Sequence, residues 1–563
     1  MAVEAGTPTL AAPLPPIPLR RRLYGFGSIY GKTVRDSRLA FIVITGVLVG
    51  MMLAAGAAMK DVFPTPESRS GVDTLIASIP ASMAGLFGNP VKVGTLPGVI
   101  NWKYGPFFAL GAGLWSILAL SSTLAGEARR GSLDFAVATP RSRRSIALEK
   151  VAGHVAAIAA AMVVVAVATW ATGAIFARMA GDPIAPEAAI AFAVGLGVKA
   201  LIAGSIAFVL APFIGRGAAA GIAGALMLAG YVVNGYRTVV PAFDSLANAT
   251  WFSWTAGHLP LAGQSDWPSV GLVALACVAL LGLGVEAFAR RDIGVTISVP
   301  TPALPGALLG LRGPLGRSFG DLLPAALAWG VGVGLYGFVM AATSRPFSEA
   351  LASTPGLADA VRGIIPGIDM TTTAGFLQLA FTELGFVLVG LAAATLVAVR
   401  SSDETAGRLE LQLTTPLSRA RWAVASAAAV VAAIAVITVV LGASIGAGVA
   451  AVGDDPVQPA AGTLVLALYG AALAGVGAAV AGVFGAWLAA PTVLALAIGT
   501  FLVDLLAPAL RLPDWVEQLA LTAHLGKPMV GSWDGAGIVA CLVLAIGGVA
   551  LAAWGMNRRD VSG

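Results

Sequence analysis

Long apolar runs recur along almost the whole chain, and the short segments between them hold most of the charged residues. A helix that crosses a lipid bilayer needs about 20 mostly apolar residues. Runs of that length occur twelve times, so the pattern predicts an all-α polytopic membrane protein with twelve transmembrane helices. The expected spans are 39–59, 104–125, 151–177, 189–212, 218–236, 268–288, 322–343, 374–399, 422–447, 461–481, 486–508 and 535–555.

The composition excludes a soluble protein of this length. Hydrophobic residues make up 58% of the 563 positions and charged residues 11%, whereas soluble proteins carry about 25% charged residues. A soluble chain of this size would form several domains with charged surfaces. Cys277 and Cys541 both lie inside apolar runs, so we expect neither a disulfide framework nor a zinc site.

The distribution of Lys and Arg predicts the orientation in the membrane, because cytoplasmic loops are enriched in these residues. With a cytoplasmic N-terminus, the cytoplasmic segments hold 23 Lys and Arg and the opposite side holds 9. Both termini are therefore expected in the cytoplasm, and residues 1–38 are expected to form a tail and an amphipathic elbow helix. Arg outnumbers Lys, as in GC-rich bacterial genomes, so we expect a bacterial plasma (inner) membrane.

Two loops, 126–143 and 402–419, repeat each other at a constant shift of 276 positions. The residues after the sixth and twelfth spans match as well, with Arg-Arg-Asp at 290–292 and at 558–560. The identical loop pairs are Gly131 with Gly407, Leu133 with Leu409, Thr139-Pro140 with Thr415-Pro416, and Ser142-Arg143 with Ser418-Arg419. We therefore predict two six-span halves, which have the same orientation because six is an even number.

The repeat divides the chain into two transmembrane halves and their connections. The first half covers 39–300 and the second half 322–556. A cytoplasmic linker and a second elbow are expected at 301–321, and a short cytoplasmic tail at 557–563. The second elbow, near 317–323, matches the first poorly.

Each repeated loop contains signals for a short helix followed by a new helix. Thr139-Pro140 and Thr415-Pro416 are typical of a helix start, with an N-cap hydroxyl followed by Pro at the first helical position. Before them, Leu133 and Val137 lie four residues apart and share one helical face. The apolar face and the second copy favour a docking surface for a cytoplasmic partner over a plain connecting turn. In the second copy, alternating leucines leave a short strand as an alternative.

The loop pattern, acidic–x–x–x–Gly–x–Leu–acidic followed by Thr-Pro–x–Ser-Arg, resembles the coupling loop of type 2 ATP-binding-cassette (ABC) exporter permeases. Segments 27–38 and 289–294 resemble stretches of the permease subfamily that exports polyketide antibiotics, including the tetronasin type. The resemblance covers nearly the whole chain. It implies that the loops dock two copies of a cytoplasmic ABC ATPase, which binds the ATP and magnesium, while this chain holds no cofactor. The implied coupling residues are Glu127, Arg129, Gly131, Leu133, Asp134, Val137, Thr139 and Pro140, with Asp403, Glu404, Gly407, Leu409, Glu410, Leu413, Thr415 and Pro416.

Two other features could suggest a nucleotide site or a metal site, but neither has the required residues. Residues 25–33 nearly spell a phosphate-binding loop, but Phe26 stands where the first Gly is required. His154, His258 and His524 are too few and too scattered for a metal site. No arrangement of catalytic side chains stands out, so we expect a transport subunit and no enzyme activity in this chain.

Ionisable residues inside spans are costly and usually face protein or water. Lys199, Glu383 and Asp504 are such residues, and Asn234 and Trp170 are weaker candidates for a substrate path. Lys199 and Glu383 are expected either to pair across the halves or to line a cavity.

The function expected from the resemblance is export of hydrophobic or amphiphilic compounds, such as antibiotics, drugs or lipid-like molecules. Hydrophobic small molecules and membrane lipid are then the other partners, and no nucleic acid is expected. An ion-coupled secondary transporter is the alternative, but it has no use for two coupling loops. A membrane-embedded enzyme would need a cluster of polar catalytic groups, which the sequence lacks.

Overall fold

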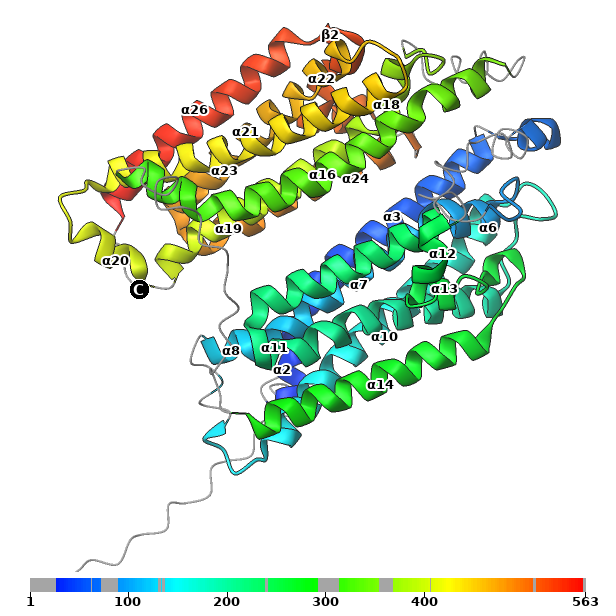
Figure 1. The fold of residues 1–563 in the computed structure, drawn as a ribbon, viewed down its shortest axis with the longest axis horizontal. Coiled ribbons are helices and arrows are strands. Elements are labelled where there is room, and N and C mark those ends of the chain that lie inside the picture. The colour runs from blue at the N-terminus through cyan, green and yellow to red at the C-terminus, as the bar shows by residue number, and fades with distance from the viewer. Residues whose placement is uncertain are drawn as a thin grey trace, which may run out of the picture.

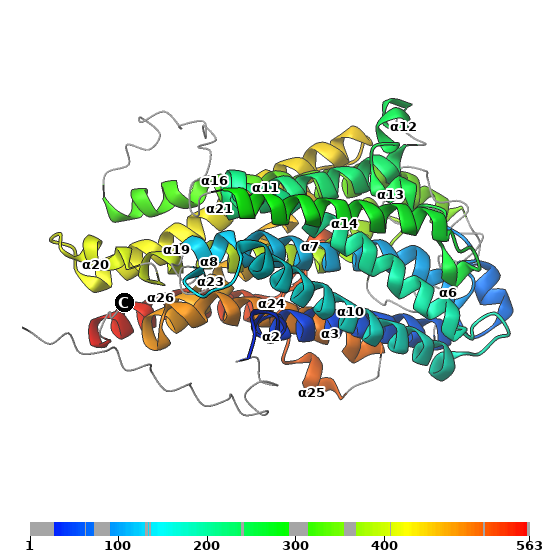
Figure 2. The ribbon, with the colours of Figure 1, turned by 90° about the horizontal axis from the view of Figure 1, so that it is seen from below.

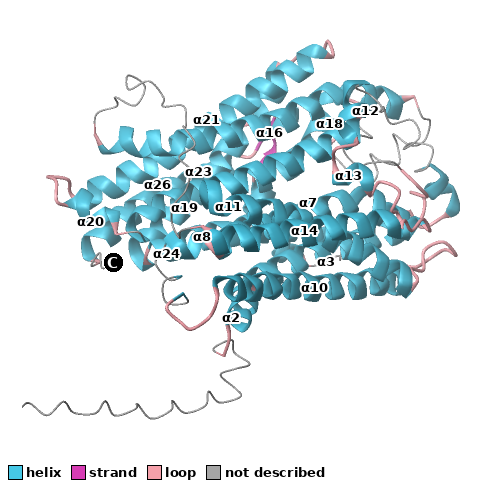
Figure 3. Cartoon of the chain, turned by 60° about the horizontal axis from the view of Figure 1, so that its bottom comes forward, coloured by secondary structure: helices cyan, strands magenta, loops and turns pink. Residues whose placement is uncertain are grey.

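The computed structural model describes residues 27–61, 63–71, 90–129, 133, 137–237, 241–291, 313–353, 368–405, 407–509 and 513–559. Figure 3 shows that these residues are almost entirely helical, with one small pair of strands. Eleven helical segments in the described ranges are long and apolar enough to cross a membrane. The predicted all-α polytopic class is therefore confirmed, because each segment is close to or above the bilayer requirement of about 20 residues.

The first half begins with a short helix and contains five of the long segments. Its elements are α2 (Ile29–Asp36), α3 (Arg38–Asp61), α6 (Leu96–Val99), the π-helix η2 (Ile100–Tyr104), α7 (Gly105–Thr123), α8 (Ala125–Arg129), α10 (Arg143–Phe176), α11 (Pro186–Tyr236), α12 (Pro241–Ala247), α13 (Trp251–Trp254), η3 (Pro260–Ala262) and α14 (Trp267–Arg290).

The second half contains the other six long segments. Its elements are α16 (Pro314–Ala352), α18 (Thr373–Ala380), α19 (Thr382–Thr405), α20 (Arg408–Leu413), α21 (Arg419–Ala451), α22 (Val457–Gly462), α23 (Leu464–Phe484), α24 (Ala486–Ala509), α25 (Asp514–Glu517), η4 (Leu521–His524), β1 (Gly526–Lys527), η5 (Pro528–Val530), β2 (Ser532–Trp533) and α26 (Gly535–Arg558). The antiparallel pair β1–β2 joins Gly526 to Trp533 and Lys527 to Ser532.

The predicted fourth and fifth spans are merged in α11, which accounts for the count of eleven segments. A helix of 51 residues would be about 77 Å long, more than twice the thickness of the hydrocarbon core. Gly215 interrupts it with φ 78° and ψ 167°, a backbone that favours glycine. At the corresponding point of the second half, Gly485 has φ 116° and separates α23 from α24. The break at Gly215 is compatible with two crossings in α11, so the total of twelve crossings stays a prediction.

The two predicted elbows differ. α2 is a separate helix, capped by the Ser28 side chain, which accepts a hydrogen bond from the Gly31 N–H at 3.0 Å. The described part of the second elbow, from Pro314 onward, instead forms the first turns of α16, which continues to Ala352. No separate helix forms there, because the helical backbone runs unbroken through Pro324.

The long helices run side by side, and α2, α8 and α20 lie at one end of the molecule, which we call the loop end (Figures 1 and 2). The opposite end carries α6, α13 and the β1–β2 pair. Each half encloses its own large apolar core. The main contact between the halves is made by α3 and α24.

Candidate functional site

The first repeated loop is held by a buried carboxylate. Glu127 of α8 accepts hydrogen bonds from Lys32 of α2 at 2.9 Å and from Lys150 of α10 at 2.8 Å. The side chain of Lys150 is 3% exposed and that of Glu127 10% exposed. Burial raises the pKa of Glu127, but the two lysines outweigh it, and the pKa lies below its ordinary value of 4.5. The elbow, the loop and α10 are thus tied together by one acid.

Leu133 anchors the same loop by apolar contact. It is fully buried in a cluster that includes Ile146, Phe208 and Phe288, and Val137 packs against this cluster. Thr139 and Pro140 are exposed. Gly131 and Asp134 lie outside the described residues; Arg129 is placed in α8, but its side chain is not described.

The second loop is anchored by a different set of charges. Asp403, the counterpart of Glu127, accepts hydrogen bonds from Arg400 at 2.8 Å, Arg408 at 3.1 Å and Gln412 at 3.0 Å. Its neighbour Glu404 forms a two-bond ion pair with Arg559 at 2.6 and 2.7 Å. The acid position is shared between the loops, whereas its cationic partners are not.

Leu409 repeats the apolar anchor of the first loop. It is fully buried against Trp422 and Met556, and Leu413 packs against the same cluster. Gly407, with φ 69°, makes the turn that starts α20. On the outer side, Leu411 is 72% exposed, and Glu410, Thr415 and Pro416 are exposed.

The predicted helix starts at the Thr-Pro pairs are wrong by three residues. α10 and α21 begin at Arg143 and Arg419, and their N-caps are Ser142 and Ser418. Each serine side chain accepts a hydrogen bond from a backbone N–H in the first turn, so the serine, not the threonine, satisfies the helix end.

Matched positions of the two halves make the same long-range bond. Arg143 donates from Nη1 to the carbonyl oxygen of Arg291 at 2.8 Å, and Arg419 donates from Nη1 to that of Arg559 at 2.8 Å. Each bond links the start of the helix after the loop to the end of the last long helix of that half.

The candidates for a substrate path are dispersed. Lys199 is partly buried in α11, whereas Trp170 on α10 is 46% exposed. Asn234 accepts a hydrogen bond from Ser253 at 2.8 Å, and Asp504 accepts one from Thr522 at 2.6 Å. Glu383 is the second residue of α19, beside the break at Phe381, and its side chain is not described. Among the described side chains, no hydrogen bond or ion pair joins any two of these residues, and pairing of Lys199 with Glu383 stays a prediction.

The second half matches a known family. Residues 311–557 match the family described as multidrug efflux system permease Rv1217c, C-terminal domain. No curated protein matches the chain. Together with the membrane-spanning helices, the family match supports a drug-efflux transmembrane permease, a transport subunit rather than an enzyme.

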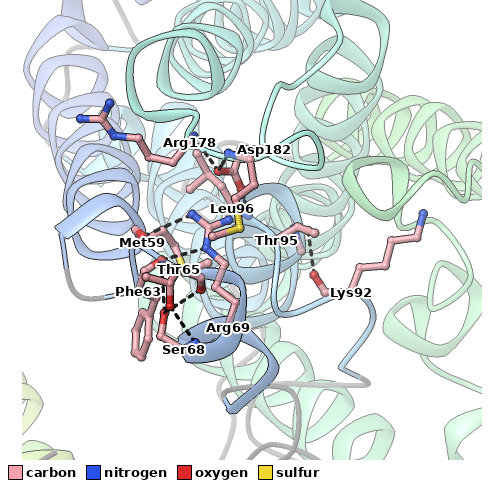
Figure 4. Close-up of polar contacts among 12 residues, drawn as sticks. Met59, Phe63, Thr65, Ser68, Arg69, Lys92, Thr95, Leu96, Arg178 and Asp182 are labelled. Atoms are coloured by element: carbon pink, nitrogen blue, oxygen red, sulfur yellow. Dashed lines mark hydrogen bonds and ion pairs between the residues drawn. The ribbon is translucent and has the colours of Figure 1, made fainter. Parts of the chain in front are cut away.

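At the end of the molecule opposite the loop end lies a buried ion pair that the sequence did not predict. Arg69 and Asp182 pair with side chains 4% and 0% exposed, and they join the segment after α3 to the α10–α11 connection (Figure 4). Burial raises the pKa of Asp182, but Arg69 and backbone donors outweigh it, so the pKa lies below 3.8. The backbone N–H groups that donate to Asp182 are those of Leu96, Arg178 and Met179. The only indication of this contact in the sequence is that two separate loops carry opposite charges. Many other pairs of loops do so as well, so the pairing could not be predicted.

Proposed function

We propose that the chain is the membrane subunit of an ABC exporter that moves hydrophobic or amphiphilic compounds. In this proposal ATP and magnesium bind to two separate ATPase subunits, which dock on the two repeated loops. The loop end then faces the cytoplasm of a bacterial cell, and both termini lie on that side. The family match of the second half and the two similarly anchored loops at one end support the proposal.

The observation that carries the proposal is that both loops are anchored from the inside and that the second loop also exposes a leucine on its outer side. Leu133 and Leu409 are fully buried and hold each loop to its own half. In the second loop, Leu411 points away from this anchor and is 72% exposed. A large apolar side chain in this position, flanked by the exposed Glu410, would lose its contact with water in a protein interface, where apolar residues fill the centre. We therefore assign docking to the outer face of α20, and anchoring to Leu133 and Leu409.

The anchors also give a route for motion. Glu404 of α19 and Arg419 of α21 both bind Arg559 at the end of α26, so α19, α21 and α26 are joined at the loop end. Arg408 and Gln412 attach α20 to this group, because both bind Asp403 of α19. A force on α20 would therefore act on three long helices at once. Such rigid connections suit a rocking motion of the halves between inward-facing and outward-facing states.

The two docking sites are expected to be unequal. Glu127 is bound by two lysines, one of them from α2, whereas Asp403 is bound by two arginines and Gln412. The first loop is thus tied to the separate elbow helix α2, whereas Arg400 beside the second loop binds Asp321 of the long helix α16 at 3.5 Å. The ATPase subunits would therefore meet differently supported surfaces.

The test is co-purification of the chain with an ABC ATPase encoded beside it. We would compare Leu411→Asp with Leu519→Asp, which changes a leucine of similar exposure (67%) near α25. We expect two ATPase copies per wild-type chain, loss of one of the two with Leu411→Asp because the first loop is unchanged, and two copies with Leu519→Asp. Retention of both ATPase copies by a folded Leu411→Asp variant, or no association with the wild type, would overturn the proposal.

A further inference from the structure

The last long helices of the two halves, α14 and α26, differ at one matched surface position. The repeated Arg-Arg-Asp sequences and the matched bonds of Arg143 and Arg419 place position 286 opposite position 554, at a shift of 268. The first half carries a glutamate there and the second half a tryptophan. The side chain of Glu286 is 39% exposed, and Trp554 is 50% exposed. The same surface position is therefore acidic in one half and aromatic in the other.

This exchange leaves an arginine of the second half without a carboxylate. Glu286 binds Arg290 at 3.1 Å and Arg144 at 2.7 Å. The counterpart of Arg290 is Arg558, whose guanidinium carbon lies 4.4 Å from the centre of the Trp554 ring. Arg558 is exposed, and no carboxylate in the described part of the chain binds it. A guanidinium that lies over an aromatic ring keeps its charge and can still bind an anion through its N–H groups.

The helix face that leads to Arg558 is apolar. Trp554 and Leu551 precede Arg558 by four and seven residues, and Leu544 precedes Leu551 by seven, so all four lie on one side of α26. Leu551 is 52% exposed and Leu544 is 39% exposed. An exposed apolar face that ends in a tryptophan and an arginine is typical of a helix that leaves the hydrocarbon core of a membrane.

A second exposed tryptophan lies close to the end of α26. Trp487, in the first turn of α24, is 67% exposed, and the shift of 270 between Gly215 and Gly485 makes Gly217 its counterpart. A Cβ at Gly485 would lie 3.1 Å from the Trp487 ring and 3.5 Å from Nη1 of Arg559, so the turn before α24 meets the end of α26 (Figure 2). Because tryptophan is enriched at the membrane–water boundary, both tryptophans indicate that this boundary passes here.

We propose that Arg558 and Trp554 bind the headgroup of an anionic phospholipid. The guanidinium binds the phosphate, since arginine and phosphate form strong charge-assisted hydrogen bonds. The indole lies at headgroup level, and the acyl chains run along Leu551. A lipid fits better than an acidic protein, because the exposed face continues from the arginine as an apolar surface. The proposal needs the loop end to lie at a membrane boundary, and it does not depend on an ATPase partner.

The bound lipid would act on the anchor of the second loop. Arg558 precedes Arg559, whose guanidinium binds Glu404 at 2.6 and 2.7 Å and whose carbonyl oxygen accepts a hydrogen bond from Arg419. A headgroup on Arg558 would thus hold the end of α26 and, through it, the helices on both sides of the second loop. The first half has no such site, because Glu286 already binds the matched arginine. Lipid composition would therefore influence the second loop and not the first.

The test is native mass spectrometry of the purified full chain in mild detergent, titrated with phosphatidylglycerol or with phosphatidylcholine, whose choline cancels the phosphate charge. Arg558→Gln should lower the affinity for phosphatidylglycerol about fivefold, the effect of one basic side chain near an anionic headgroup. The affinity for phosphatidylcholine should not change. Glycerol 3-phosphate, which has the phosphate but no acyl chains, should not displace phosphatidylglycerol at equal concentration.

The first half supplies the matched controls. Arg290→Gln should change the affinity about twofold or less, because this arginine already has a carboxylate partner and exposed pairs contribute little. Trp554→Glu copies the first half into the second and should lower the affinity as much as Arg558→Gln does, because the new carboxylate would bind Arg558. Arg558→Lys keeps the charge and should keep most of the affinity. All of these positions are exposed or half-buried, and unfolding in dodecyl sulfate checks that each variant is folded.

Four results would overturn the proposal. Unchanged affinity in Arg558→Gln would mean that the lipid binds elsewhere, and equal losses in Arg558→Gln and Arg290→Gln would mean that only general surface charge matters. Displacement by glycerol 3-phosphate would show a phosphate site that does not select lipid. Loss of ATPase co-purification in Arg558→Gln with unchanged lipid affinity would assign this arginine to a protein interface instead.

Discussion

Removing Glu127 should destabilise the loop end by leaving a buried lysine without a partner. The Lys150 ammonium lies 2.8 Å from the Glu127 carboxylate, and its side chain is 3% exposed. Lys32 also binds Glu127, but its side chain is 40% exposed, so water can replace the lost carboxylate there. The variant Glu127→Ala therefore tests mainly the pair with Lys150.

The magnitude follows from the burial of this pair. At 2.8 Å and an effective dielectric constant of about 20, two unit charges attract by about 6 kcal/mol. Desolvation of both groups offsets part of this attraction, and breaking a buried pair from one side typically costs about 3–5 kcal/mol. Replacing both partners costs much less, so Glu127→Ala with Lys150→Met should recover about 2 kcal/mol or more of the loss. Lys32→Met should cost about 1 kcal/mol or less, as exposed pairs do.

The assay is reversible unfolding in mixed micelles of mild detergent and dodecyl sulfate, followed by circular dichroism. The free energy of unfolding should be highest for the wild type, lower for Lys32→Met, lower again for the double variant, and lowest for Glu127→Ala. Since the pKa of Glu127 is lowered in the folded state, its contribution is present above pH 4.5 and is lost as the pH falls through the folded pKa. A double variant less stable than Glu127→Ala would refute the reasoning, because Lys150 would then not be the unpaired charge.

Three further predictions address other anchors. Leu409→Ala should lower the free energy of unfolding by about 2–5 kcal/mol, whereas Leu411→Ala should change it by about 0.5 kcal/mol or less, both by the same dodecyl sulfate titration. Asp182→Asn should destabilise the chain at neutral pH and reduce the pH dependence of its free energy of unfolding below pH 3.8, because the lowered pKa of Asp182 gives stability that is lost on acidification. A pH series of unfolding curves would show this, and an equal loss of stability on acidification in wild type and variant would contradict it. Gly485→Ala should cost more than about 1 kcal/mol, because alanine is strained at φ 116°; unchanged thermal stability would refute the role of this turn.

The long helices could be predicted from the sequence because the apolar runs have the length that a bilayer demands. Their boundaries were less predictable. The predicted spans at 189–212 and 218–236 merge in α11 because helical hydrogen bonding continues up to Gly215 and resumes directly after it. Ser142 and Ser418 cap their helices in place of the threonines three residues earlier, and both kinds of residue are acceptable N-caps by sequence alone.

The repeated loops could be found from the sequence, but the direction of their side chains could not. Leu133 and Leu409 lie among polar and other apolar residues in the two loops, which fits either a docking face or an internal anchor. Both side chains are fully buried in the structure, which supports the anchor, and their part in ATPase coupling stays a prediction. The pair of Arg69 with Asp182 was out of reach, since 113 positions separate the two residues, and only tertiary packing brings them together.

ATP-driven efflux by the assembled complex is the most direct test of the central claim. We would reconstitute the chain with the ATPase encoded beside it and measure uptake of a fluorescent hydrophobic drug into inside-out vesicles. We predict uptake that requires ATP and magnesium, persists without an ion gradient, and is lost with Leu411→Asp but not with Leu519→Asp. Uptake driven by a proton or sodium gradient without ATP would contradict the account and favour an ion-coupled transporter.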